Sequence, residues 1–305
     1  MRKILIIKLG ALGDVMRTTP ILRRLSGSVT WITSRRALPL LAGNPRIARL
    51  ITPGDFPGIR GEDFDWVINF DEDARACALA AEAKAPKKTG ALLNAGRPDY
   101  CESSAPWFDM SLISRLGIKE ADRLKYRARK SYQHYLFQAC GFEFGGEEYI
   151  LPPLPAAAAR PLVGIEERTG HRWPLKRWPG CGGLTRLLKG AGIDFIILRQ
   201  RRKLLDYISD IGSCAVLVSG DTLAMHAALA LGRRAVTVFN CTSPGEIYGY
   251  GRLSKLLHPR LRDLFYSTGD FDESLGSVKE KAVFDAVIRA LRTDRPPKIY
   301  PANVL

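Results

Sequence analysis

The sequence predicts an α/β protein made of two layered domains with parallel sheets, and three observations predict it. The chain has 305 residues, and single cores rarely grow beyond about 250–300 residues. Short apolar strands alternate with helical segments in both halves, which is the pattern of parallel βαβ units. A proline- and alanine-rich stretch at 151–159 lacks a core pattern and is typical of a linker. We therefore expect domains at 1–155 and 156–305.

The first half opens with the apolar run Ile4–Ile7, which is typical of a buried parallel strand. Gly10 and Gly13 follow and allow a tight turn whose N–H groups can face a ligand. Asp14 comes next, where a helix starts, and Thr19-Pro20 either starts a second helix or kinks a longer one. Further strands are expected at 29–33, 50–51 and 66–70, and helices at 21–25, 35–43, 74–83 and 132–140. Residues 84–130 are less regular.

The second half restarts with a strand at 162–165 and a polar loop beginning at Glu166. Strands are also expected at 195–198, 215–219 and 235–239. The expected helices lie at about 184–189, 204–211, 223–231 and 278–291, and a tail begins at Pro296. The helix that begins near residue 223 should stop at Gly232, as a C-cap glycine would make it.

Composition limits the class of protein. No apolar run approaches the roughly 18 residues of a membrane span or forms a signal-peptide core, so we expect a cytoplasmic protein. The six cysteines form no CxxC pair and no metal-ligand spacing, which favours reduced thiols and no metal site. We expect no cofactor.

The net charge of +15 requires an explanation. Nucleic acid, an anionic membrane surface and a phosphorylated substrate are all suitable partners, and a merely basic surface is the simplest alternative. No zinc-finger, RRM, KH or helix-turn-helix signature is present, so nucleic acid is not expected.

Three stretches together resemble glycosyltransferase family 9, the ADP-heptose lipopolysaccharide heptosyltransferases. They are ILIIKLGALGDVMRTTPIL at 4–22, RWPLKRWP at 172–179 and VLVSGDTLAMHAALALGRRAVTVFNCTSP at 216–244. The resemblance implies a GT-B fold, two Rossmann-like domains facing a central cleft. It also implies an N-terminal domain that holds the acceptor and a C-terminal domain that holds the nucleotide-sugar. The implied reaction is inverting, metal-independent transfer of a heptose-like sugar to a lipopolysaccharide or glycolipid acceptor.

Asp14 matches the position of the family's catalytic base. Sugar transfer needs a base for the acceptor hydroxyl, and partial burial of a carboxylate raises its pKa toward that use. The alternative is that Asp14 only caps the helix that follows.

Asp221 and Thr222 end a strand and open a helix, where free N–H groups and the helix dipole favour an anion. His226 lies four residues beyond Thr222, on the same helix face. The resemblance makes Thr222, the Leu223 N–H and His226 a diphosphate cradle, although a structural role for His226 stays open. The family commonly has glycine where Leu223 stands, so this side chain narrows the approach to the phosphates.

Lys176 lies in a loop between Trp173 and Trp178, where its charge would neutralise a leaving diphosphate without a metal ion. The alternative is a solvated basic loop packed by the tryptophans, and the role of Arg177 is left open.

One departure from the family concerns the ribose. Where the family has a Gly-Gly turn and a ribose-binding glutamate, this chain has Arg199–Lys203, and the distance to Asp221 is short by about one βα unit. Asn240 also replaces a usual glycine. A non-catalytic sugar-nucleotide or glycan-binding protein with a degenerate donor site is therefore the second hypothesis. A basic nucleic-acid binder is the third.

A basic run in the first domain suggests a membrane contact. It comprises Arg123, Lys125, Arg127, Arg129 and Lys130. In an extended segment, alternate residues would point the same way and could hold an anionic, membrane-borne acceptor at the inner face of the plasma membrane. On a helix they would spread around it, and a solvated loop is the simplest alternative.

Overall fold

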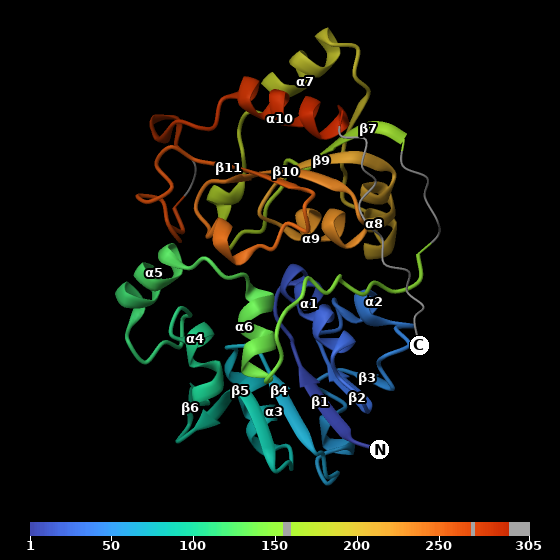
Figure 1. The fold of residues 1–305 in the computed structure, drawn as a ribbon, viewed down its shortest axis with the longest axis vertical. Helices are drawn as coiled ribbons and strands as arrows, with labels where there is room; N and C mark the ends of the chain where they lie inside the picture. The colour runs from blue at the N-terminus through green and yellow to red at the C-terminus, as the bar shows by residue number, and fades with distance from the viewer. Residues whose placement is uncertain (155–159, 270–271, 293–305) are drawn as a thin grey trace. The chain divides into compact units, whose positions relative to one another are not determined.

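The computed structural model describes residues 1–154, 160–269 and 272–292 (Figure 1). The chain divides into two compact units, Met1–Pro153 (unit 1) and Leu154–Leu305 (unit 2). The boundary expected between residues 155 and 156, most of the expected linker and the expected tail lie outside the described residues.

Unit 1 is built on a six-stranded sheet with the strand order β3-β2-β1-β4-β5-β6. All neighbouring strands are parallel except β5 and β6. The run Ile4–Ile7 is fully buried and makes β1 a central strand, as its continuous apolar sequence predicts. The strands are β1 (Lys3–Ile7), β2 (Ser28–Ile32), β3 (Arg49–Ile51), β4 (Trp66–Asn69), β5 (Lys87–Asn94) and β6 (Arg97–Tyr100).

The helices of unit 1 follow local sequence signals. Asp73 caps α3, since its Oδ1 accepts hydrogen bonds from the N–H groups of Arg75 and Ala76. Pro20 lies in the first turn of a separate 3-10 helix, so Thr19-Pro20 starts a second helix rather than kinking one. The helices are α1 (Leu12–Thr18), α2 (Leu38–Leu41), α3 (Ala74–Glu82), α4 (Ala105–Phe108), α5 (Ile118–Arg127) and α6 (Tyr132–Ala139), with 3-10 turns η1 (Thr19–Arg23), η2 (Phe56–Gly58) and η3 (Glu102–Ser104).

Residues 84–130 are more regular than predicted. They contain the hairpin of β5 and β6, whose two-residue turn places Ala95 and Gly96 at positive φ. They also contain α5, so the basic run from Arg123 to Arg127 is helical, and of the two arrangements considered for it the helical one is present.

Unit 2 contains a five-stranded, fully parallel sheet with the order β11-β10-β9-β7-β8. Figure 1 shows α7 and α10 on one face and α8 and α9 on the other. The strands are β7 (Arg160–Ile165), β8 (Phe195–Ile197), β9 (Cys214–Gly220), β10 (Arg234–Phe239) and β11 (Leu253–Leu257). The helices are α7 (Cys181–Gly190), α8 (Leu204–Gly212), α9 (Leu223–Ala230) and α10 (Glu280–Arg292), with 3-10 turns η4 (Pro174–Lys176), η5 (Pro244–Glu246) and η6 (Glu273–Leu275).

The edge strand β11 is not predicted from the sequence, because none of its side chains is fully buried. The Gly232 stop is confirmed, since this residue has a positive φ and directly follows Leu231, the C-cap of α9. All six cysteines are free thiols, and all but Cys101 are buried. In the ranges that the structure describes, no helix is long and apolar enough to cross a membrane, and no group of His, Cys, Asp or Glu could hold a metal ion.

Both sheets have a point where the strand order reverses. In unit 1 it lies between β1 and β4, and in unit 2 between β7 and β9. Open α/β sheets bind their ligands at the carboxyl ends of the strands at such points. These two positions are therefore the places to look for a site.

Candidate functional site

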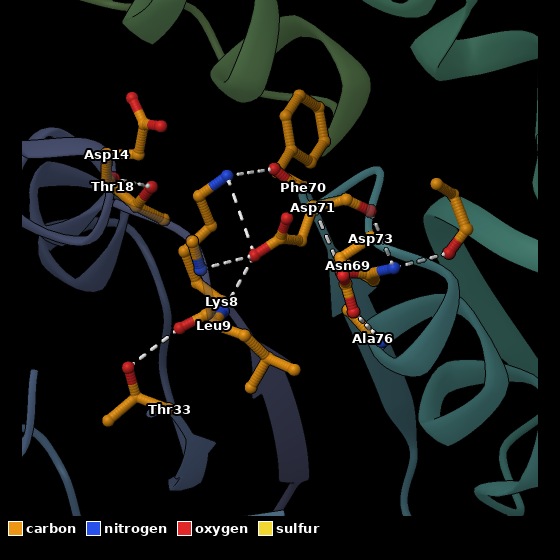
Figure 2. Close-up of polar contacts among 12 residues, drawn as sticks. Lys8, Leu9, Asp14, Thr18, Thr33, Asn69, Phe70, Asp71, Asp73 and Ala76 are labelled. Carbon is orange, nitrogen blue, oxygen red and sulfur yellow. Dashed lines mark hydrogen bonds and ion pairs between the residues drawn. The ribbon is translucent and has the colours of Figure 1, made fainter. Parts of the chain in front are cut away.

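A buried ion pair joins the ends of β1 and β4 in unit 1. Lys8 follows β1, and its Nζ lies 4.0 Å from Oδ2 of Asp71, which comes two residues after β4. The Lys8 ammonium also donates a hydrogen bond to the carbonyl oxygen of Phe70 (Figure 2). Both charged side chains are only 7% exposed. The pair therefore fixes the two strand ends on either side of the reversal point.

Two opposing effects act on the charge of Lys8. Burial lowers the pKa of its ammonium, but attraction to Asp71, with smaller contributions from Tyr132 and Asp14, outweighs burial and leaves that pKa raised. Lys8 is therefore a fixed positive charge at the carboxyl end of the sheet.

The glycine turn after β1 is held by protein rather than open to a ligand. Oδ2 of Asp71 accepts hydrogen bonds from the N–H groups of Leu9 at 2.7 Å and Gly10 at 2.6 Å (Figure 2). A Cβ on Gly10 would approach this oxygen to 3.2 Å, so glycine suits the close contact. The expectation that the Gly10 N–H faces a ligand is wrong, because Asp71 occupies it. Gly13 is buried within α1.

Asp14 is the third residue of α1, not its cap. Ala11 is the N-cap, and no side chain makes a capping hydrogen bond there, so the capping alternative is wrong. Oδ1 of Asp14 lies 2.9 Å from Nη2 of Arg17, and the Asp14 side chain is 35% exposed. This ion pair orients the Asp14 carboxylate.

Aromatic side chains hold Arg17 beside Asp14. The Arg17 guanidinium lies 4.3 Å from the ring centroid of Tyr132 and 5.7 Å from that of Trp107. The Tyr132 hydroxyl is 2.8 Å from Oγ1 of Thr18, which in turn donates to the carbonyl oxygen of Asp14 at 2.7 Å. Helices α1 and α6 thus position the candidate base as one packed cluster.

In unit 2 the structure brings two predicted residues together. Asp221 follows β9, and its Oδ2 lies 3.2 Å from Nζ of Lys176 in η4. The two side chains are 12% and 21% exposed, so Lys176 is not part of a fully solvated loop. A Cβ on Gly220 would lie 2.1 Å from the carbonyl oxygen of Lys176, so only glycine lets the Lys176 turn pack against the end of β9.

The turn that carries Lys176 is anchored on both sides. Nδ2 of Asn240, just after β10, donates to the carbonyl oxygens of Leu175 at 3.0 Å and Arg177 at 2.8 Å. Trp178 is buried, and its indole N–H donates to the carbonyl oxygen of Val278 at 2.9 Å. The Arg177 side chain is exposed. Asn240, noted in the sequence only as a departure from glycine, therefore positions the Lys176 turn.

The start of α9 offers polar atoms to a ligand. Thr222 is its N-cap, and the Thr222 hydroxyl is buried without a hydrogen-bond partner in the described parts of the chain. Outside α9, the hydroxyls of Ser219 in β9, Thr237 in β10 and Thr242 lack described partners as well. Leu223 is the first residue of the helix and is partly exposed, whereas His226 is buried. Unpaired polar atoms at a helix N-terminus favour an anionic ligand or bound water.

Sequence reasoning missed a cluster at the end of β7. Glu166 is buried and binds the Arg168 guanidinium through both carboxylate oxygens, at 2.8 and 2.7 Å. The Tyr207 hydroxyl donates to the same carboxylate, and burial, followed by the charge of Glu166, raises the pKa of this phenol. Because Tyr207 is 41 residues away in the sequence, only the fold reveals the contact.

The expected ribose position contains no equivalent of the family's glutamate. In its place the Arg201 guanidinium binds the carboxylate of Asp210 on α8, with Nε 2.6 Å from Oδ2. This ion pair lies within unit 2. No residue of the described chain is assigned to the ribose.

Comparison with solved structures identifies the architecture of both units as that of GT-B glycosyltransferases. The chain is similar to a family 9 glycosyl transferase from Veillonella parvula, at 16% identity over 95% of this chain and 97% of that chain, with a TM-score of 0.67. It is also similar to Escherichia coli heptosyltransferase WaaC with ADP, at 16% identity over 94% and 99% of the two chains and a TM-score of 0.64. E. coli ADP-heptose lipopolysaccharide heptosyltransferase II matches at 17% identity over 95% and 98%, with a TM-score of 0.63.

No family model and no curated protein matches the sequence. At these identities the structural likeness establishes the fold, so the two Rossmann-like domains predicted from the sequence are confirmed. The solved structures that share this fold include the family that the sequence motifs resemble.

Proposed function

We propose that the protein is an inverting glycosyltransferase that moves a heptose-like sugar from ADP-heptose to a lipopolysaccharide or other glycolipid acceptor. The observation that carries the proposal is the Lys176–Asp221 pair beside the Thr222 hydroxyl at the N-terminus of α9, which has no hydrogen-bond partner among the residues that the structure describes. A cation, a free hydroxyl and helix N–H groups together suit a diphosphate.

The choice of donor rests on structural relatives. E. coli heptosyltransferase WaaC has been solved with ADP and with ADP-2-deoxy-2-fluoro heptose, and both structures share the fold of this chain. Lys176, Thr222, the Leu223 N–H and His226 would bind the diphosphate of such a donor. Lys176 would supply positive charge to the leaving group, so the proposal invokes no metal ion.

Asp14 would act as the general base on the acceptor. Its carboxylate takes the proton of the acceptor hydroxyl, and the hydroxyl oxygen bonds to the anomeric carbon of the sugar. The bond between that carbon and the phosphate oxygen breaks, ADP leaves, and the anomeric centre inverts. Arg17, 2.9 Å from Oδ1 of Asp14, would orient the carboxylate.

The acceptor step is tested with Asp14→Asn. Purified protein is assayed for sugar transfer from ADP-heptose to lipopolysaccharide-type acceptors, and ADP binding is measured by calorimetry. We expect transfer to fall by about 100-fold or more, as for loss of a general base, with unchanged ADP affinity. Glu102→Gln, which neutralises an exposed carboxylate in the same unit, is the control. Transfer by Asp14→Asn at close to the wild-type rate would refute the role of Asp14.

The donor site is tested by comparing ADP with adenosine. Lys176→Ala and His226→Ala should weaken ADP binding by about 10- to 100-fold each, since a charge-assisted hydrogen bond is worth about 1.5–3 kcal/mol. Adenosine binding should change little. Lys176→Ala leaves the Asp221 carboxylate without Lys176, so that it would repel the phosphates, and the double variant Lys176→Ala/Asp221→Asn removes this repulsion. Arg172→Ala is a control, since it removes an exposed arginine nearby in the sequence. Equal losses for both ligands would mean that these residues act through structure.

The second candidate is a non-catalytic sugar-nucleotide or glycan-binding protein. The observation that favours it is the Arg201–Asp210 pair at the place where the family has its ribose-binding glutamate. Such a protein would bind ADP or a glycan but would neither transfer nor hydrolyse any nucleotide-sugar of a broad panel. A nucleic-acid binder, the third hypothesis, would instead show salt-dependent retention on DNA.

A further inference from the structure

Exposed apolar side chains concentrate in one segment of unit 1. Among the described residues, seven large hydrophobic side chains are exposed, and four of them lie between residues 112 and 126. They are Leu112 (54% exposed), Leu116 (53%), Ile118 (49%) and Tyr126 (41%). Scattered exposed hydrophobic residues are normal, but such a concentration marks an interaction surface. We call residues 112–130 the α5 surface.

Helix α5 contributes little to the core of unit 1. It has ten residues, and only Ala121 is buried. Gly117, with a φ of +82°, precedes the helix and allows the turn that separates the apolar residues Leu116 and Ile118. A helix with so little buried surface gains little stability from packing, so its sequence suits a function at the surface.

The helical geometry decides between the two arrangements considered for the basic residues. Lys119, Arg123 and Arg127 are spaced by four and lie on one side of α5. All three side chains are exposed, although Arg123 also binds Glu120 within the helix. Arg129 and Lys130 follow as further exposed cations. The α5 surface has seven basic and two acidic residues, so its apolar side chains lie in a strongly cationic segment.

We propose that the α5 surface docks on an anionic lipid bilayer. Leu112, Leu116 and Ile118 would enter the boundary between headgroups and acyl chains, and the basic residues would contact lipid phosphates. Apolar side chains together with Lys and Arg are the signature of interfacial segments. Protein interfaces are depleted of lysine, and single-stranded nucleic acid is bound through stacked aromatic side chains rather than Leu and Ile. The proposal does not depend on the sugar-transfer chemistry.

Flotation of the full chain with vesicles tests the proposal. Vesicles of equal parts phosphatidylglycerol and phosphatidylcholine are compared with pure phosphatidylcholine, at low and high salt. We expect binding to the anionic vesicles only, weakened by salt. Lys119→Gln/Arg127→Gln/Lys130→Gln should reduce binding by about fivefold per charge. Leu112→Ser/Leu116→Ser/Ile118→Ser should reduce it by about tenfold or more.

Matched controls separate the α5 surface from general charge and hydrophobicity. Leu257→Ser removes an equally exposed leucine of unit 2. Arg35→Gln/Arg36→Gln/Lys84→Gln removes three exposed charges elsewhere in unit 1. Neither control should change vesicle binding, and thermal unfolding checks that each variant is folded.

Three outcomes would overturn the proposal. These are a wild-type protein that does not bind anionic vesicles at low salt, control variants that lose as much binding as the α5 variants, and an apolar variant that binds unchanged. Self-association in light scattering that the apolar variant abolishes, without any vesicle binding, would identify a protein interface instead.

Discussion

Asp71→Asn should loosen the end of β1, although it changes one side chain by a single charge at nearly constant shape. Asp71 balances the buried charge of Lys8 and accepts the N–H groups of Leu9 and Gly10. The substitution leaves the Lys8 ammonium, only 7% exposed, without its counter-ion. Removing one partner of a buried ion pair costs about 3–5 kcal/mol. The asparagine oxygen can still accept a hydrogen bond from the turn, so most of the loss should come from the charge.

Hydrogen exchange of a peptide covering β1 measures the loss of stability at β1 itself. The chain has two units, so a single melting transition need not report on unit 1, whereas exchange reports the local opening free energy. Lys8→Met should also destabilise β1. Lys8→Met/Asp71→Asn should be less unstable than the sum of the single variants, because it leaves no unpaired charge. Glu62→Gln breaks the more exposed Arg49–Glu62 pair and should cost only about 1 kcal/mol or less.

The raised pKa of Lys8 adds a pH dependence with a defined sign. A group whose pKa is higher in the folded state contributes its full stability below the ordinary lysine pKa of about 10.4. That contribution is lost as the pH rises through the higher folded pKa. The wild-type protein should therefore lose more β1 protection in alkali than Lys8→Met does. If Asp71→Asn stays within about 1 kcal/mol of wild type, the pair does not hold the strand ends as inferred.

Two further predictions concern a backbone contact and a thiol. Gly220→Ala should displace the Lys176 turn, because the added Cβ would lie 2.1 Å from the Lys176 carbonyl oxygen. The substitution should lower both the melting temperature and the affinity for ADP. Gly182→Ala is the control, since no atom lies within 4 Å of the Cβ that it adds. Cys101 should react first with iodoacetamide near neutral pH. Burial alone would raise the pKa of the Cys101 thiol, but hydrogen bonds from Ser103, Ser104 and the Gly90 N–H outweigh burial and lower this pKa. In contrast, burial raises the pKa of the Cys140 thiol to about 12. A fast labelling phase that persists in Cys101→Ser would contradict this assignment.

The fold is predictable from the sequence where burial leaves a continuous pattern. The runs Ile4–Ile7 and Val216–Val218 are buried on both faces of parallel strands, so their apolar sequence alone marks them as strands. The sequence of the β5–β6 hairpin has no such continuous apolar run. Gly90 in β5 is required by a neighbouring strand, since its Cβ would lie 1.8 Å from the Asn69 carbonyl oxygen, and this contact exists only after folding.

The residues of the candidate site also differ in whether the sequence alone reveals them. Asp221, Thr222 and His226 could be found because they are close in the sequence and follow a predicted strand. Asp71 was visible as an acid after a strand, but its hydrogen bonds to a turn about 60 residues away depend on the pairing of β1 with β4. The charges near 123–130 are visible in the sequence, whereas the helix is not predicted, because six of its ten residues are charged and only Ala121 is buried.

Leu223→Gly should improve the phosphate site rather than damage it. Leu223 is the first residue of α9, where the helix N–H groups would meet a diphosphate, and it is partly exposed. If that side chain obstructs the phosphates, its removal should tighten ADP binding by about tenfold, which corresponds to about 1.4 kcal/mol, and leave adenosine binding unchanged. Leu223→Ala, which keeps the Cβ, should give part of the gain. Glycine in a helix costs up to about 1 kcal/mol, so a slightly lower melting temperature is expected for Leu223→Gly. A folded Leu223→Gly protein that binds ADP no better than wild type would show that the side chain does not limit the site.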